Sequence, residues 1–182
     1  MDDTYALSTL AVRAGQRRSQ FNEHSEALYL TSSFVFESAA QAAGRFTGGD
    51  EGNVYSRFTN PTVTMFQERL AALECAESCL ATASGMSAIL MTAMSLLKAG
   101  DHVVCSSAVF GSTVTLFGTI LARFGVATAF VPASDVAAWK AAVRPDTKLL
   151  FLETPSNPLT ALSDIAAIAN IAHGAGALLA VD

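Results

Sequence analysis

Cysteine and histidine are scarce in this 182-residue sequence, which holds three of each. Cys75, Cys79 and Cys105 form no Cys-x-x-Cys pair, and the histidines are isolated from one another and from the cysteines. An odd number of unpaired cysteines is typical of free thiols in a reducing compartment, and ligands this scattered do not indicate a zinc site. We therefore expect a cytoplasmic protein without a metal.

Charged residues are also few, at 15% of the chain against 51% hydrophobic residues, with a net charge of −5. No apolar run approaches the roughly 20 residues of a membrane span. The scattered lysines and arginines do not build a nucleic-acid surface, and Met1-Asp2-Asp3 lacks the basic start of a signal peptide. We expect neither a membrane nor a nucleic acid as partner. The mean hydropathy of +0.38 indicates surface that something else covers.

Glycine-rich nucleotide loops are absent, since neither G-x-G-x-x-G nor G-x-x-x-x-G-K-[ST] occurs. This disfavours a dinucleotide-binding domain. A single glycine, Gly85, stands in Ala83-Ser84-Gly85-Met86-Ser87, where an expected strand leads into a helix. Glycine lets the backbone approach a ligand, and the free N–H groups of a first helical turn bind anions. This junction is either a phosphate site or a turn of purely structural use.

Two parts of the chain differ in pattern. Residues 1–58 are polar and weakly periodic, which predicts an extended arm with one short helix near residues 37–45. Disorder is the alternative, but Tyr29, Phe34 and Val35 indicate that the arm packs on a neighbouring subunit. Residues 59–182 are regular and form the expected second part.

Strands and helices alternate in the second part. Helices are expected from Pro61 behind an Asn60 cap, at residues 84–97 and 112–124, and behind caps at Ser134 and Ser163; strands are expected at residues 79–82, 102–106, 126–131, 148–152 and 177–181. Such alternation predicts an α/β fold with a mostly parallel sheet and helices on both faces. Ligands of such sheets bind at the carboxyl ends of the strands.

Phe110, Asn157 and Asp182 each follow an expected strand. Phe110 is suited to stack on a planar cofactor, or is core. Asn157, close to two prolines, could give its amide to a ring oxygen, or belongs to a rigid turn. The Asp182 carboxylate is costly at the end of a buried strand unless it is paired. A protonated ring nitrogen is one partner, and capping of the next turn is the alternative.

A further candidate site precedes the helix at Pro61. In Gly52-Asn53-Val54-Tyr55-Ser56-Arg57-Phe58-Thr59-Asn60-Pro61-Thr62, an aromatic hydroxyl (Tyr55) and a guanidinium (Arg57) lie two residues apart. Guanidinium groups bind phosphate well. With Asp182, the pair indicates a ligand that has a phosphate at one end and a protonated ring nitrogen at the other.

From Leu7 to Asp182 the sequence resembles the Cys/Met-metabolism family of pyridoxal-phosphate (PLP) enzymes, of the aspartate-aminotransferase fold type (type I transferases). The motifs that carry the resemblance are Tyr55-Ser56-Arg57-Phe58-Thr59-Asn60-Pro61-Thr62 and Ala81-Thr82-Ala83-Ser84-Gly85-Met86. The resemblance implies a role for each candidate. Two sets would bind phosphate: Tyr55 and Arg57 reach the phosphate of a neighbouring subunit's PLP, and the N–H groups of Gly85 and Met86 bind the phosphate within the subunit. The other three would contact the ring: Phe110 stacks on it, Asn157 bonds its phenolic oxygen, and Asp182 pairs with the pyridinium nitrogen.

The family's Schiff-base lysine is not found here. It belongs to a Ser-x-Thr-Lys-like turn beyond the strand that ends at Asp182, and Lys98, Lys140 and Lys148 have no such setting. The resemblance therefore implies a truncated chain, without the rest of the large domain and without the C-terminal domain. We expect the 182-residue chain alone to be inactive and poorly soluble.

For the complete protein, the resemblance implies γ-replacement in methionine biosynthesis, in which O-succinyl-L-homoserine and sulfide give L-homocysteine and succinate. Phe110 stands where most of the family has a tyrosine, which favours the sulfhydrylase branch. Cystathionine γ-synthase, a sulfhydrylase for the acetyl ester, and a non-catalytic truncated product are the alternatives. Because Tyr55 and Arg57 would cross an interface, a homo-oligomer is expected, specifically a tetramer built from dimers.

Overall fold

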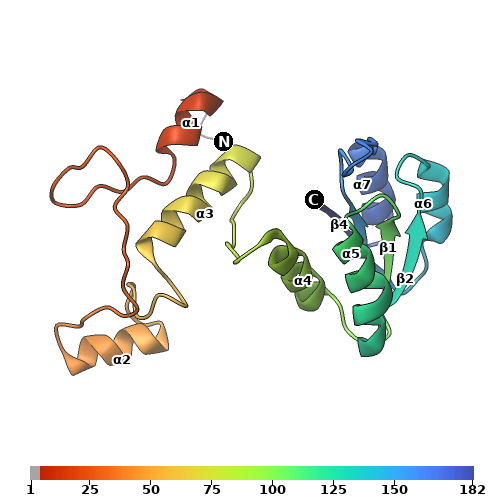
Figure 1. The fold of residues 1–182 in the computed structure, drawn as a ribbon. Helices are drawn as coiled ribbons and strands as arrows, with labels where there is room; N and C mark the ends of the chain where they lie inside the picture. The colour runs from red at the N-terminus through yellow and green to blue at the C-terminus, as the bar shows by residue number, and fades with distance from the viewer. Residues whose placement is uncertain (1–4) are drawn as a thin grey trace. The chain divides into compact units, whose positions relative to one another are not determined.

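A computed structural model describes residues 5–182, which form two compact units that divide between Ala81 and Thr82. Figure 1 shows the helices and strands of both units and labels most of them. Within residues 5–182, no helix combines the length and the apolar composition that crossing a membrane requires.

The first unit, up to residue 81, contains three helices joined by long irregular segments: α1 (Leu7–Arg13), α2 (Ala39–Thr47) and α3 (Pro61–Glu74). α3 begins as expected, with Pro61 in its first turn and the Asn60 side chain accepting a hydrogen bond from the Thr62 amide at 2.9 Å. α2 begins behind a Ser38 cap and ends at Gly48. α1 was not expected from the sequence.

α1 packs against α3 through a close backbone contact. Gly15, just after α1, has φ +73°, and a Cβ there would lie 2.6 Å from the carbonyl oxygen of Met65 in α3. The Arg69 guanidinium of α3 donates a hydrogen bond to the Ala14 carbonyl at 2.9 Å. Only glycine therefore suits this position.

The first unit has almost no core of its own. Among its described residues, only Leu10, Asn60 and Met65 are buried. Large apolar side chains are exposed along the unit: Phe21, Leu28, Leu30, Val35, Phe46, Phe58 and Phe66. Exposed apolar surface of this extent is typical of an interface, and the expected contact with a neighbouring subunit stays a prediction.

The second unit is an α/β layer structure. Its elements, in chain order, are α4 (Gly85–Leu96), β1 (His102–Ser106), α5 (Gly111–Thr115), the π-helical η1 (Leu116–Ile120), the 3₁₀ turn η2 (Leu121–Phe124), β2 (Ala127–Val131), α6 (Val136–Ala142), β3 (Thr147–Leu152), α7 (Ile165–Gly174) and β4 (Leu178–Val181). The four strands are all parallel, in the order β2-β1-β3-β4. This confirms the predicted fold class.

Helices cover both faces of the sheet, as predicted. On one face, α4 and the α5–η2 segment pack on alternate strand residues, with Ala93, Val103 and Phe117 fully buried. On the other face, α6 and α7 bury Trp139 and Ile168 against the sheet. Because both faces of the sheet are covered, every residue of β1 and all but one residue of β3 are buried.

Several local predictions were wrong. Residues 79–82 form no strand; the Ala81 amide instead donates to the Gln67 side chain of α3, at 2.8 Å. By contrast, the helical segment expected at 112–124 is confirmed; it begins at Gly111 and passes through α, π and 3₁₀ turns. The caps of α6 and α7 lie one residue later than predicted.

Those caps are Asp135 and Asp164, in place of Ser134 and Ser163. The Asp135 carboxylate accepts from the Ala138 amide at 3.0 Å, and Asp164 accepts from the Ala167 amide at 2.9 Å. A carboxylate is favoured at a helix N-terminus because it also interacts with the positive end of the helix dipole.

Candidate functional site

A cavity of about 550 Å³ lies at the carboxyl ends of the strands of the second unit. Its lining consists of Gly85, Met86, Ile89, Phe110, Thr113, Glu153, Thr154, Pro155, Asn157 and Asp182. Five of the seven residues predicted for the site are in this set. They come together because parallel strands β1, β3 and β4 all end at the same edge of the sheet.

The N-terminus of α4 forms one wall of the cavity. Ser84 caps the helix, and its Oγ accepts a hydrogen bond from the Ser87 amide at 3.2 Å. The amides of Gly85 and Met86 come earlier in the first turn, where a helix offers no internal acceptor. No atom lies within 4 Å of a Cβ built on Gly85, so the approach to these amides is open. This wall can bind an anion.

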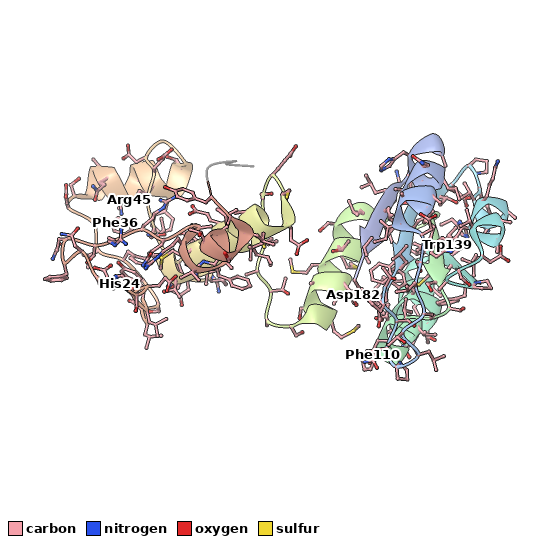
Figure 2. All side chains as sticks on the ribbon, turned by 90° about the horizontal axis from the view of Figure 1, so that it is seen from above. His24, Phe36, Arg45, Phe110, Trp139 and Asp182 are labelled. Atoms are coloured by element: carbon pink, nitrogen blue, oxygen red, sulfur yellow. The ribbon has the colours of Figure 1, made fainter. Side chains whose placement is uncertain are left out.

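Phe110 and Thr113 contribute from the start of α5. The Phe110 side chain is 50% exposed, so it is not core, and its ring is available to a ligand. Thr113 is fully buried and donates from Oγ1 to the sulfur of Met86 at 3.7 Å. This contact joins α4 to α5 beside the cavity. Figure 2 labels Phe110 together with Asp182.

The loop after β3 is held by its own hydrogen bonds. The backbone of Ser156 donates to the Ala161 carbonyl at 3.0 Å, and the Ser156 hydroxyl accepts from the Ala161 amide at 3.0 Å. Thr154 Oγ1 accepts from the Ser163 amide, also at 3.0 Å. Asn157 therefore lies in a hydrogen-bonded turn that also lines the cavity, and a bond from its side-chain amide to a ring oxygen stays a prediction.

Glu153, which the sequence analysis did not select, is the most buried acidic residue of the cavity, with 8% of its surface exposed. Its Oε2 accepts from the Phe110 amide at 2.7 Å, and its Oε1 accepts from the Asn157 amide at 2.8 Å. One available signal was its position directly after a buried strand, which is the same signal that selected Asp182.

Asp182 follows β4 and continues the strand pairing. Its amide donates to the Leu152 carbonyl at 2.9 Å, and its carbonyl accepts from the Thr154 amide at 3.1 Å. The side chain keeps an exposed surface but faces a cavity with a second carboxylate. Partial burial, followed by repulsion from Glu153, raises the pKa of the Asp182 carboxyl. A cation in the cavity would reverse this penalty.

Tyr55 and Arg57 belong to the first unit and are exposed. The Arg57 guanidinium lies 5.2 Å from the centroid of the Tyr55 ring and 5.2 Å from that of Phe58. Buried Asn60 supports this turn, since its amide donates to the Tyr29 carbonyl at 2.9 Å and to the Ser56 hydroxyl at 3.0 Å. The role of Tyr55 and Arg57 at a neighbouring subunit's site stays a prediction.

No lysine lines the cavity: Lys98 precedes Gly100 between α4 and β1, Lys140 lies in α6, and Lys148 lies in β3. Across residues 5–182, no group of three His, Cys, Asp or Glu side chains could hold a metal ion. Cys105 is buried in β1, and burial raises the pKa of its thiol to about 12. This cysteine is therefore unreactive.

Fold and cavity define an α/β protein that can bind a phosphorylated, cationic ring at the ends of its strands. The family model of the Cys/Met metabolism PLP-dependent enzymes matches residues 8–182, and the chain belongs to this family.

The chain is 63% identical to the O-succinylhomoserine sulfhydrylase of Pseudomonas aeruginosa over 177 residues, which are 97% of this chain and 44% of that protein. It is 45% identical to the O-succinylhomoserine sulfhydrylase of Mycobacterium tuberculosis, covering 100% of this chain and 45% of that protein. The chain thus spans less than half the length of these relatives.

Among solved structures, a putative O-acetylhomoserine (thiol)-lyase of Campylobacter jejuni matches with a TM-score of 0.92 at 31% identity, covering 98% of this chain and 44% of that chain. That crystal structure carries a pyridoxyl-lysine monophosphate at its position 205. The family's cofactor is PLP, so PLP is the ligand with which the cavity must be compared.

Proposed function

We propose that the protein containing this chain is a PLP-dependent γ-replacement enzyme that converts O-succinyl-L-homoserine and sulfide to L-homocysteine and succinate. The observation that carries the proposal is the cavity in which Gly85, Met86, Phe110, Asn157 and Asp182 come together. Identity of 63% to an O-succinylhomoserine sulfhydrylase supports the choice of the succinyl ester.

The residues of the cavity fit PLP on their own chemistry. The amides at the N-terminus of α4 suit a phosphate, and the open space at Gly85 allows it to approach. The half-exposed ring of Phe110 suits a planar ring. Asp182 is an anion that needs a cation, and a pyridinium N–H is one.

When bound, PLP supplies an electron sink for the carbanions that form at Cα and Cβ of the amino-acid substrate. In this proposal, Asp182 keeps the proton on the ring nitrogen, and Asn157 bonds the phenolic oxygen. Phe110 positions the ring but has no hydroxyl, so it transfers no proton. Tyr55 and Arg57 contact the phosphate of a neighbouring subunit's PLP in a tetramer built from dimers.

The experiment compares thiol and ester substrates with the intact protein in the presence of PLP. We expect homocysteine from sulfide with the succinyl ester, at a kcat/KM above that with the acetyl ester. Preference for the acetyl ester would contradict the substrate assignment and favour the activity named for the Campylobacter jejuni structure. Cystathionine from added cysteine would identify a cystathionine γ-synthase.

The isolated 182-residue chain should produce no homocysteine, because no lysine lines its cavity. Borohydride reduction in the presence of PLP, followed by mass spectrometry of protein from native cells, tests whether the protein containing this chain has a Schiff-base lysine. A species well above 19.0 kDa with a phosphopyridoxyl adduct is the expected result. A 19.0 kDa species without an adduct would instead support a non-catalytic product.

A further inference from the structure

Glu153 connects two loops of the cavity that are far apart in the sequence. One carboxylate oxygen accepts from the amide of Phe110, after β1, and the other accepts from the amide of Asn157, after β3. Both distances, 2.7 and 2.8 Å, are typical of strong bonds to an ionised carboxylate. The two bonded residues are those that the proposed function places at the face and at the edge of the ligand's ring.

This arrangement is not explained by charge pairing. None of the three ion pairs between described residues includes Glu153, although this residue is only 8% exposed. A second carboxylate, Asp182, lines the same cavity and repels it. A buried anion in such surroundings is costly unless hydrogen bonds compensate, and here the compensation comes from the two loop amides.

We propose that Glu153 is a positioning residue that holds Phe110 and Asn157 in place for the PLP ring. The inference rests on the proposed function. Glu153 acts through the backbone of the other two residues, because each of its oxygens accepts a hydrogen bond from one of their amides. The two hydrogen bonds from the amides of Phe110 and Asn157 to the Glu153 carboxylate form a clamp. This clamp makes the positions of Phe110 and Asn157 depend on each other.

The clamp requires both an ionised group and the full length of the side chain. In Glu153→Gln, the side-chain carbonyl can still accept a hydrogen bond from one of the two backbone amides. The side-chain NH2 faces the other backbone amide, and because both groups are donors, no hydrogen bond forms there. In Glu153→Asp, the charge remains, but the side chain is shorter by one methylene, about 1.5 Å of reach. The aspartate cannot therefore hold both amides at once. Both variants therefore break the clamp, Glu153→Gln with loss of the charge and Glu153→Asp with the charge retained.

Amide hydrogen exchange in the intact protein without PLP tests the clamp itself. We expect exchange at Phe110 or Asn157 to become at least roughly tenfold faster in both variants, the size of one lost bond to a charged group. Asp135→Ala is the matched control. It also removes a carboxylate that accepts a hydrogen bond from a backbone amide, but this carboxylate lies outside the cavity. It should leave both exchange rates unchanged. Unchanged rates in the Glu153 variants would overturn the proposal.

PLP binding supplies the second measurement. Glu153→Gln and Glu153→Asp should both weaken PLP binding roughly tenfold and reduce the visible circular dichroism of the bound cofactor. Asp135→Ala should lower the melting temperature and leave both PLP signals intact. Variants that melt earlier with unchanged PLP affinity and dichroism would show a merely structural role and overturn the proposal. If the unaltered protein binds no PLP, the proposed function fails, and the exchange rates still decide whether the clamp exists.

Discussion

At the scale of single residues, the cavity is a site with two carboxylates and no cation among the side chains that line it. The Glu153 carboxylate accepts hydrogen bonds from two backbone amides. The pKa of the Asp182 carboxyl, by contrast, is raised by partial burial and by repulsion from Glu153. Under the proposed function, a positively charged ligand in the cavity would remove this imbalance between the two groups. This is the strongest electrostatic argument for a pyridinium ring.

Asp182→Asn should stabilise the protein without PLP and weaken its binding of PLP. The folded-state pKa of Asp182 is raised from 3.8, so the folded chain binds this proton more tightly than the unfolded chain. The resulting stabilisation is complete below pH 3.8 and is lost as the pH rises through the higher folded pKa. At neutral pH the charge is therefore a cost that asparagine removes.

Urea denaturation at several pH values measures this effect. The midpoint of Asp182→Asn should exceed that of the unaltered protein at neutral pH, and the gap should close as the pH falls toward 4. Asp164→Asn, at a helix cap outside the cavity, is the control. A gap that persists or widens in acid would contradict the assignment of the penalty to the Asp182 charge.

At the scale of elements, α4 is the helix that connects the fold to ligand binding. Its apolar side buries Ile89 and Ala93 in the core, while its first turn opens into the cavity. The Ser84 cap satisfies the amide of Ser87, which leaves earlier amides for an anion. Burial thus fixes the orientation in which the helix presents its N-terminus.

Gly85→Ala should separate stability from binding. A Cβ at this position meets no atom within 4 Å, and alanine is the better helix former, so the melting temperature should stay the same or rise slightly. The added methyl group stands where a phosphate must approach the first-turn amides, and PLP affinity should fall about tenfold or more. Ser112→Ala, in the first turn of the neighbouring helix α5, is the comparison variant. Equal PLP affinity in Gly85→Ala and the unaltered protein would argue against a phosphate at this helix.

At the scale of the whole molecule, the two units differ in how much surface they bury. The second unit has a core on each face of its sheet, whereas the first unit exposes most of its large apolar side chains. Residues this apolar and this open are typical of an interface. A subunit contact through residues 5–58 remains our proposal for what covers them.

Val35→Asp should reduce the assembly state of the intact protein. The side chain is 94% exposed within the chain, so a charge there costs the isolated fold little, whereas a charge in a covered interface costs much more. Sedimentation velocity at several concentrations would show the shift to smaller species. Ser25→Asp places the same charge at an exposed polar position of the same unit and should assemble normally. Unchanged assembly of Val35→Asp would exclude this residue from the interface.

Local sequence patterns were enough to predict the architecture of the second unit and the edge of the sheet at which the candidate site lies. Apolar periodicity predicted the paired strands β1 to β4, and their parallel order meant that Phe110, Asn157 and Asp182 meet at one edge. These features are local patterns along the chain, and each strand end is visible in the sequence alone. Motifs also carried the resemblance to the family that residues 8–182 match.

The interactions among the residues at that edge could not be predicted from the sequence, because they depend on the tertiary structure. Residues 79–82 can form a strand only if another strand pairs with them. The Ala81 amide instead donates a hydrogen bond to the Gln67 side chain of α3. The role of Glu153 depends on an amide 43 residues away in the sequence. Sequence periodicity tells which side chains are buried, but the partner of a buried carboxylate is set by which loops the folded sheet brings within hydrogen-bonding distance.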